Sequence, residues 1–128
     1  NYIFGFPEDT FDTMQQTLDL ALELNTEMAN LYPFQALPGS PLYVKAKAEG
    51  WRLPDTYQGY GFLSYEATPM ATKFVSAEDV VRFRDQAWKT YHKNPAFLNL
   101  IQGRFGVEAR AGIEDLSKVE LKRRILGD

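Results

Sequence analysis

The chain has 128 residues, 45% of them hydrophobic and 24% charged, which is typical of one globular domain large enough to bury a core. It contains no apolar run near the roughly 20 residues that span a bilayer and no recognisable signal peptide, so no membrane span is expected. The net charge of −3 disfavours general nucleic-acid binding, which requires a basic surface.

The beginning of the chain predicts a strand, a helix and a second strand. Residues 2–6 (YIFGF) are apolar without polar alternation, which indicates a buried strand that Pro7 ends. Asp9 or Thr10 is expected to cap a helix that continues to Asn25, with apolar residues at helical spacing. Residues 28–34 (MANLYPF) predict the second strand. This order is the βαβ unit of a parallel sheet.

The sheet predicted in this way is incomplete. Two parallel strands are not a stable sheet, and strands that are apolar on both faces expect further neighbours. No later segment supplies a comparable strand, so we expect that residue 1 is not the natural start and that a neighbouring strand is missing. The exposed strand edge is then expected to pair with another copy of the chain, which gives a homo-oligomer.

The middle of the chain predicts a short helix and a long irregular connection. In residues 36–43 (ALPGSPLY), Ser40 is expected to cap a helix that has Pro41 at its first position and stops at Gly50. Residues 51–72 show no period and hold five aromatic residues interrupted by proline and glycine. A loop this long is usually functional or packed by its own side chains. It either lines a pocket for a large planar or lipid-like substrate or packs the extension, and we favour packing.

The last third of the chain predicts helices. Ser76 and Asp79 resemble a capping box at the start of the clearest one, in which Trp88 and Tyr91 are assigned to the core. The pair Asn94-Pro95 breaks this helix and caps the next. A final helix is expected over residues 113–126, with Leu116 and Val119 on its apolar side.

Charged residues near the end of the chain are interpreted as solvated. The basic residues of this region are expected on the surface and last turn of the final helix, where cations suit the dipole; they are Lys118, Lys122, Arg123 and Arg124. Arg82 and Arg84 are also interpreted as solvated, with Asp79 and Asp85 near for weak pairs.

The chain has no cysteine and a single histidine, His92. This excludes disulfides, thiolate nucleophiles and an iron–sulfur cluster held by the chain's own residues. It also fits a cytoplasmic protein weakly. His92 is interpreted as a surface or packing residue, so histidine-based metal sites and serine–histidine triads are disfavoured. Any chemistry must be supplied mainly from elsewhere.

The order of the segments YIFGFPEDT, NLYPFQALPGSPLY, EGWRLP and SAEDVVRFRDQAWKTYHKNP resembles the C-terminal half of radical S-adenosylmethionine (SAM) enzymes. The match is to the class with a cobalamin-binding domain, such as the anaerobic magnesium-protoporphyrin cyclase group. In that family a strand reading G-x-I-x-G-x-P-x-[ED]-T is the fifth of a partial (β/α)6 barrel, and P-G-[ST]-P-L-Y follows the sixth. The family's CxxxCxxC loop and cobalamin domain have no counterpart in this chain.

The resemblance implies a fold class between α/β and α+β. Residues 1–50 would be the βαβ remnant of a partial (β/α)6 TIM-like barrel, with strands five and six. Residues 51–75 would be an aromatic irregular connection, and residues 76–128 a mainly helical C-terminal extension. Sites in such barrels lie at the carboxyl ends of the strands.

Candidate cofactor-binding residues follow from the resemblance. Ile3 and Gly5 would line the adenosyl site, although Gly5 is almost equally explained by relief of helix–strand crowding. Glu8 would lie at the rim and hold a substrate or ribose hydroxyl, whereas Asp9 is explained by helix capping. Gln35 would hydrogen-bond adenine or substrate, and a purely structural role for it is slightly favoured.

The turn after the second strand completes this set of candidates. Pro38 and Gly39 would close over the adenine, while Gly39 also serves the turn through a positive φ. No catalytic and no metal-binding residue is expected in the chain.

The parent protein is accordingly expected to be a radical SAM iron–sulfur oxidoreductase or methyltransferase with a small-molecule substrate. Its cofactors would be S-adenosylmethionine, a [4Fe–4S] cluster and, if it belongs to the cobalamin class, cobalamin. This chain would form part of the adenosyl-site wall and substrate pocket, and would bind none of these cofactors and be inactive in isolation. The alternative is a non-catalytic helical protein-interaction domain that shares only the βαβ start.

Overall fold

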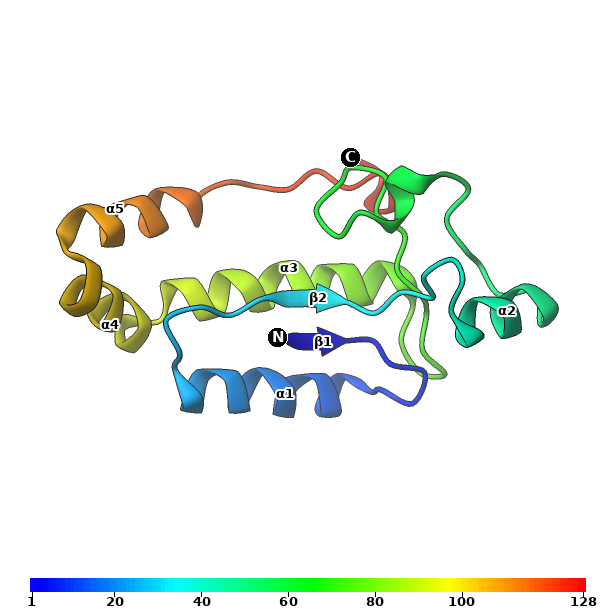
Figure 1. The fold of residues 1–128 in the computed structure, drawn as a ribbon, viewed down its shortest axis with the longest axis horizontal. Helices are drawn as coiled ribbons and strands as arrows, with labels where there is room; N and C mark the ends of the chain where they lie inside the picture. Colours follow the sequence, from blue (N-terminus) through cyan, green and yellow to red (C-terminus); the bar gives the residue numbers. More distant parts are fainter.

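The computed structural model describes residues 1–128 as a mixed α/β fold of five helices around a two-stranded parallel sheet (Figure 1). None of the helices has the length and apolar character needed to cross a membrane. The elements in chain order are β1 (Tyr2–Phe4), α1 (Phe11–Leu24), β2 (Leu31–Pro33), α2 (Pro41–Ala48), α3 (Ala77–Lys93), α4 (Pro95–Phe105) and α5 (Val107–Leu116). Short 3-10 helices lie at Tyr57–Tyr60 and Arg124–Leu126.

The predicted βαβ unit is confirmed, with shorter strands than expected. β1 and β2 have three residues each and pair in parallel, with Ile3 opposite Tyr32. β1 ends early because Gly5 has a φ of +91°, which turns the chain out of the strand. α1 is capped by Thr10, whose side chain accepts a hydrogen bond from the backbone N–H of Thr13, and it ends at Asn25.

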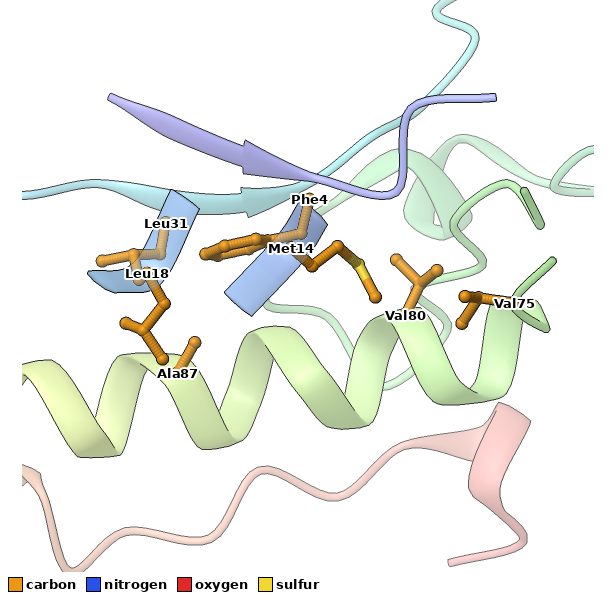
Figure 2. Close-up of a cluster of buried hydrophobic side chains, with 7 residues drawn as sticks. All are labelled: Phe4, Met14, Leu18, Leu31, Val75, Val80 and Ala87. Carbon is orange, nitrogen blue, oxygen red and sulfur yellow. The ribbon is translucent and has the colours of Figure 1, made fainter. Parts of the chain in front are cut away.

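The main core lies between the sheet and the helices α1 and α3. Phe4 and Leu31 from the strands contact Met14 and Leu18 from α1, while Val80 comes from α3 (Figure 2). Both helices therefore cover the same face of the sheet. Strand side chains alternate between faces, so the neighbouring positions Ile3 and Tyr32 lie on the other face.

The predicted helix starts are confirmed at three further positions. The side chains of Ser40, Ser76 and Asn94 each accept a hydrogen bond from a backbone N–H in the first turn of α2, α3 and α4. Proline occupies the first position of α2 and of α4, where its missing N–H costs no helical hydrogen bond. Residues 51–72 are irregular apart from one 3-10 turn, as expected.

The prediction of a last helix over residues 113–126 is wrong. α5 instead begins after Gly106, whose φ is +92°, and ends at Leu116. Residues 117–123 then run back along α3 as an irregular segment (Figure 1). The apolar spacing of Leu116 and Val119 does not produce a helix. Arg123 instead bonds to groups far away in the sequence, which hold this segment in an extended, irregular path.

The assignment of Arg84 and Arg123 to the solvated surface is also wrong. Arg123 is fully buried, and its Nε and Nη2 atoms donate to the two carboxylate oxygens of Asp85 at 2.9 and 2.7 Å. Its Nη1 atom donates to the backbone oxygens of Phe62 and Ser64. Arg84 is 4% exposed and donates from Nε to the backbone oxygen of Leu31. Buried guanidinium groups need such partners, and these anchor the end of the chain to α3.

Candidate functional site at the strand ends

The turn between β1 and α1 is organised by the carboxylate of Asp9. Its Oδ2 atom accepts hydrogen bonds from the backbone N–H groups of Gly5 and Phe6, both at 2.9 Å, and Oδ1 accepts one from Oγ1 of Thr13. The backbone oxygen of Asp9 accepts a further hydrogen bond from Oγ1 of Thr72. Asp9 is therefore a structural residue, although it holds the strand-to-helix turn rather than the helix N-cap.

Gly5 lies where β1 meets α3. A Cβ atom at this position would lie 2.6 Å from Cγ1 of Val80, and the positive φ adds strain for any other residue. Packing against α3 thus accounts for this glycine. From the sequence alone, relief of helix–strand crowding and contact with a ligand explained Gly5 almost equally well.

Glu8 extends from the same turn into solvent. Its carboxylate pairs with the amino group of Lys73, and both side chains are largely exposed. The two residues line one end of an open groove of about 580 Å³ between this turn, α2 and the start of α3, with Trp51 and Arg52 on its far side. The backbone hydrogen bond from the N–H of Lys73 to the oxygen of Pro7 holds this end of the groove together.

An acidic residue at the start of α3 also lines this groove. The pKa of Glu78 is lowered, mainly by hydrogen bonding to its own backbone N–H and further by Arg52, which donates to its carboxylate at 2.8 Å. The groove carries charges of both signs and contains no uncompensated acid that would act as a general base.

Gln35 lies at the end of β2 beneath the irregular connection. Its side chain is buried, and Nε2 donates a long hydrogen bond of 3.4 Å to the backbone oxygen of Gly59. Its Oε1 atom is buried with no hydrogen-bond partner. An unpaired buried acceptor costs about 1–3 kcal/mol, so this oxygen is a site that a donor group of a ligand would satisfy.

Pro38 and Gly39 form an exposed turn between β2 and α2. Gly39 has a φ of +89° and open space around the position of a Cβ, so its conformation and not a close contact requires glycine. The backbone N–H of Ser40 donates to the oxygen of Leu37 and closes the turn.

The free face of the sheet is apolar and partly covered. Ile3 is 36% exposed, and Tyr32 packs on Phe62 with ring centroids 4.7 Å apart. Phe6 and Phe34 pack in the same way at the ends of the two strands, at 4.4 Å. Phe62 of the connection thus packs on a strand, in line with the packing role favoured from the sequence.

The two outer edges of the sheet differ. In a parallel pair of strands, the backbone groups of alternate residues form hydrogen bonds with the partner strand. The backbone groups of Tyr2 and Phe4 point toward β2. The N–H and C=O of Ile3 therefore point to the other side, where no strand lies. On the outer edge of β2, the oxygen of Leu31 accepts from Arg84, and Pro33 has no N–H to offer. The β1 edge is therefore open and the β2 edge is closed.

The six candidate residues do not converge on one cavity. Glu8 lines the groove beside α2, and none of the other five residues lines it. Ile3 lies on the free face of the sheet, Gly5 and Gln35 are buried, and Pro38 and Gly39 are exposed.

Arg84 is the structural feature that the sequence interpretation missed. Val80, Ala87 and Tyr91 form the apolar stripe of α3, and Arg84 falls at the same helical spacing between them. A cation within an apolar stripe is a signal of a buried, partnered side chain, and this signal was present in the sequence.

Comparison of the chain with protein-family models, curated proteins and solved structures finds no match. No group of three His, Cys, Asp or Glu side chains is placed to hold a metal ion.

Proposed function

We propose that this chain is the C-terminal part of a radical SAM enzyme, in which β1 and β2 are strands five and six of a partial (β/α)6 barrel. The observation that carries the proposal is the difference between the two sheet edges. Because strand six is the last of such a barrel, its outer edge needs a cap, whereas strand five needs a neighbour. The open edge at Ile3 and the edge closed by Arg84 match these two requirements.

The arrangement of the layers also supports this proposal. In a barrel of this type, helices cover the outer face of the strands, the inner face lines the barrel interior, and the site lies at the carboxyl ends of the strands. Here α1 and α3 cover one face, and the other presents Ile3 and Tyr32. That second face would be the interior wall, and the missing strands would complete it beside Ile3.

The residues of the chain fit the adenosyl part of S-adenosylmethionine in one respect. The unpaired Oε1 of Gln35 is an acceptor that the exocyclic amino group of adenine would satisfy, and Ile3 offers an apolar surface for the ring. Gly59 covers Gln35, so the connection at residues 51–75 must shift for direct contact. Gly5, Pro38 and Gly39 show packing or turn roles only.

The chain's own residues do not fit an iron–sulfur cluster, since it contains no cysteine. When bound to the parent protein, the cluster and S-adenosylmethionine would supply the radical chemistry. This chain would contribute binding surface, exclude water through its aromatic packing and hold the end of strand six in place. The parent would be an oxidoreductase or a methyltransferase, and a member of the cobalamin class would also bind cobalamin.

The reading frame upstream of Asn1 tests the proposal. We expect a CxxxCxxC motif about a hundred or more residues earlier, given the length of four strand–helix units. A short frame that starts near Asn1 would contradict the proposal and favour the non-catalytic interaction domain. That alternative draws support from α5, none of whose residues is buried although Ala109 and Ile113 pack on the cluster of α3 and α4.

A binding measurement on the parent protein tests the role of Gln35. Gln35→Leu is expected to weaken S-adenosylmethionine binding about tenfold, because it removes the acceptor, while the control Gln15→Leu on the exposed face of α1 leaves it unchanged. Equal affinities of the two variants would show that Gln35 is purely structural.

A further inference from the structure

A second groove, separate from the strand ends, runs between α3 and the returning C-terminal segment. It encloses about 870 Å³ and is walled by α3 on one side and by residues 116–128 on the other. Leu63 of the irregular connection lies at its rim. It lies on the closed-edge side of β2, and the proposed adenosyl wall does not use it.

Arg84 is the buried charged residue of this groove. The side chain is 4% exposed, and two of its three nitrogen atoms have partners: Nε donates to the oxygen of Leu31 at 2.7 Å and Nη1 to Oδ1 of Asp85 at 2.9 Å. The third, Nη2, donates to no protein acceptor, and Arg84 is one of the lining residues. A fixed guanidinium with one unused donor atom at a cavity wall is a preorganised anion site.

Two guanidinium groups share one carboxylate behind this wall. The carboxylate of Asp85 is shared by Arg84 and the fully buried Arg123, so two buried cations face one anion. Burial lowers the pKa of Arg84, and Arg123 adds to this effect, although Asp85 opposes it. The carboxylates of Glu120 and Asp128 also line the groove, but Glu120 pairs with Lys89 and Asp128 accepts a hydrogen bond from the backbone N–H of Arg123. Neither is bonded to the Arg84 guanidinium, so Nη2 is left as a donor for an anionic ligand.

The rest of the groove combines apolar surface with charged side chains of both signs. Trp88 of α3 faces Leu116, Leu121 and Leu126 across it, and Leu116 and Leu121 are 52% and 38% exposed. Lys122 at its margin has no ion-pair partner. Apolar walls beside a buried cation suit a ligand that is anionic at one end and apolar along the rest.

We propose that this groove binds an organic carboxylate that carries an apolar chain or ring. The carboxylate accepts a hydrogen bond from Nη2 of Arg84, and the apolar part lies between Trp88 and the leucines of the C-terminal segment. An inorganic anion gains nothing from the leucine surface, and an apolar cation is repelled by the paired guanidinium groups. The site is independent of the proposed radical SAM function.

Titration calorimetry with decanoate, below its micelle concentration, tests the site in the chain as described. We expect saturable binding at one site, with decyltrimethylammonium and decanol binding at least about tenfold more weakly, because the ammonium has no hydrogen-bond acceptor and the alcohol carries no negative charge. Non-saturable binding of decanoate, or equal binding of the cation, would overturn the proposal.

Three variants test whether decanoate binds in this groove. Arg84→Lys keeps the charge but loses the free donor, and Leu121→Glu places a carboxylate on the exposed wall, where folding is not at risk. Both are expected to weaken decanoate binding about tenfold, whereas Lys118→Gln, an exposed charge outside the groove, leaves it unchanged. Circular dichroism of each variant checks the fold. If Leu121→Glu folds and binds decanoate as tightly as the unsubstituted chain does, the groove is not the binding site.

Discussion

The backbone of Gly5 and the side chain of Val80 are in direct contact, so that a Cβ at residue 5 would lie 2.6 Å from Cγ1 of Val80. This contact joins β1 to α3, two elements separated by more than seventy residues of sequence. It fixes the distance between the sheet and α3, the helix from which Arg84 closes the outer edge of β2.

Gly5→Ala should destabilise the fold by roughly 2–4 kcal/mol, because a clash with Val80 adds to the strain of a positive φ. Gly39→Ala is the matched control: its φ is +89° with open space around it, so strain alone costs about 1–2 kcal/mol. Urea unfolding of both variants measures the difference. Equal losses would show that Val80 does not constrain residue 5.

Ile3→Lys should reduce self-association of the isolated chain. The backbone N–H and C=O of Ile3 point away from β2, and an exposed strand edge pairs readily with a second copy. A lysine at the edge opposes such pairing by charge and hydration. Light scattering at increasing concentration should show dimers for the parent chain and monomers for the variant.

A matched control keeps this experiment specific to the edge. Leu24→Lys replaces an apolar residue that is 57% exposed and lies in the helix α1, which offers no strand edge for pairing, so it should leave association unchanged. A parent chain that stays monomeric at high concentration would contradict the expected pairing.

Local signals in the sequence predicted much of this fold. Thr10, Ser40, Ser76 and Asn94 cap their helices through side chains that bond to residues two or three positions away, so the neighbouring sequence is enough to identify them. The βαβ unit was predictable for the same reason, since apolar period and length distinguish its strands from its helix.

The errors concern residues whose partners are distant. Arg123 is buried because Asp85, Phe62 and Ser64 surround it, and no pattern within residues 113–126 contains that information. The same holds for Gln35, whose burial depends on Gly59, and for the failure of the candidate residues to share one cavity. Tertiary contacts override local propensity at these positions.

Asp85→Asn should destabilise the protein by about 3–5 kcal/mol, because two buried guanidinium groups would lose their shared anion. The C-terminal segment should also detach first, since Arg123 anchors it. Limited proteolysis is expected to cut residues 117–122 faster in the variant than in the parent chain. The control Asp115→Asn breaks a pair in which both side chains are more than 70% exposed, and should cost at most about 1 kcal/mol.

The free energy of unfolding should decrease as the pH is lowered, because His92 titrates. Burial lowers the pKa of this imidazole below its ordinary value of 6.5, and Arg84 adds to the lowering, while the hydrogen bond between Nδ1 and the oxygen of Trp88 opposes it. Between the folded pKa and 6.5 the unfolded chain binds a proton that the folded chain does not, so stability is lost as the pH falls through this window.

The slope in this window should approach at most about 1.4 kcal/mol per pH unit, the value for one proton. Urea unfolding between about pH 7.5 and about pH 5, a range that spans the ordinary pKa of 6.5, measures this slope. It is measured in the unsubstituted chain and in His92→Asn, whose side chain keeps a hydrogen-bond donor but does not titrate. The variant should show a flatter dependence, whatever its absolute stability, because the remaining titration comes mainly from carboxyl groups at lower pH. Equal slopes in the two proteins would place the acid sensitivity on other groups and contradict the assignment to His92.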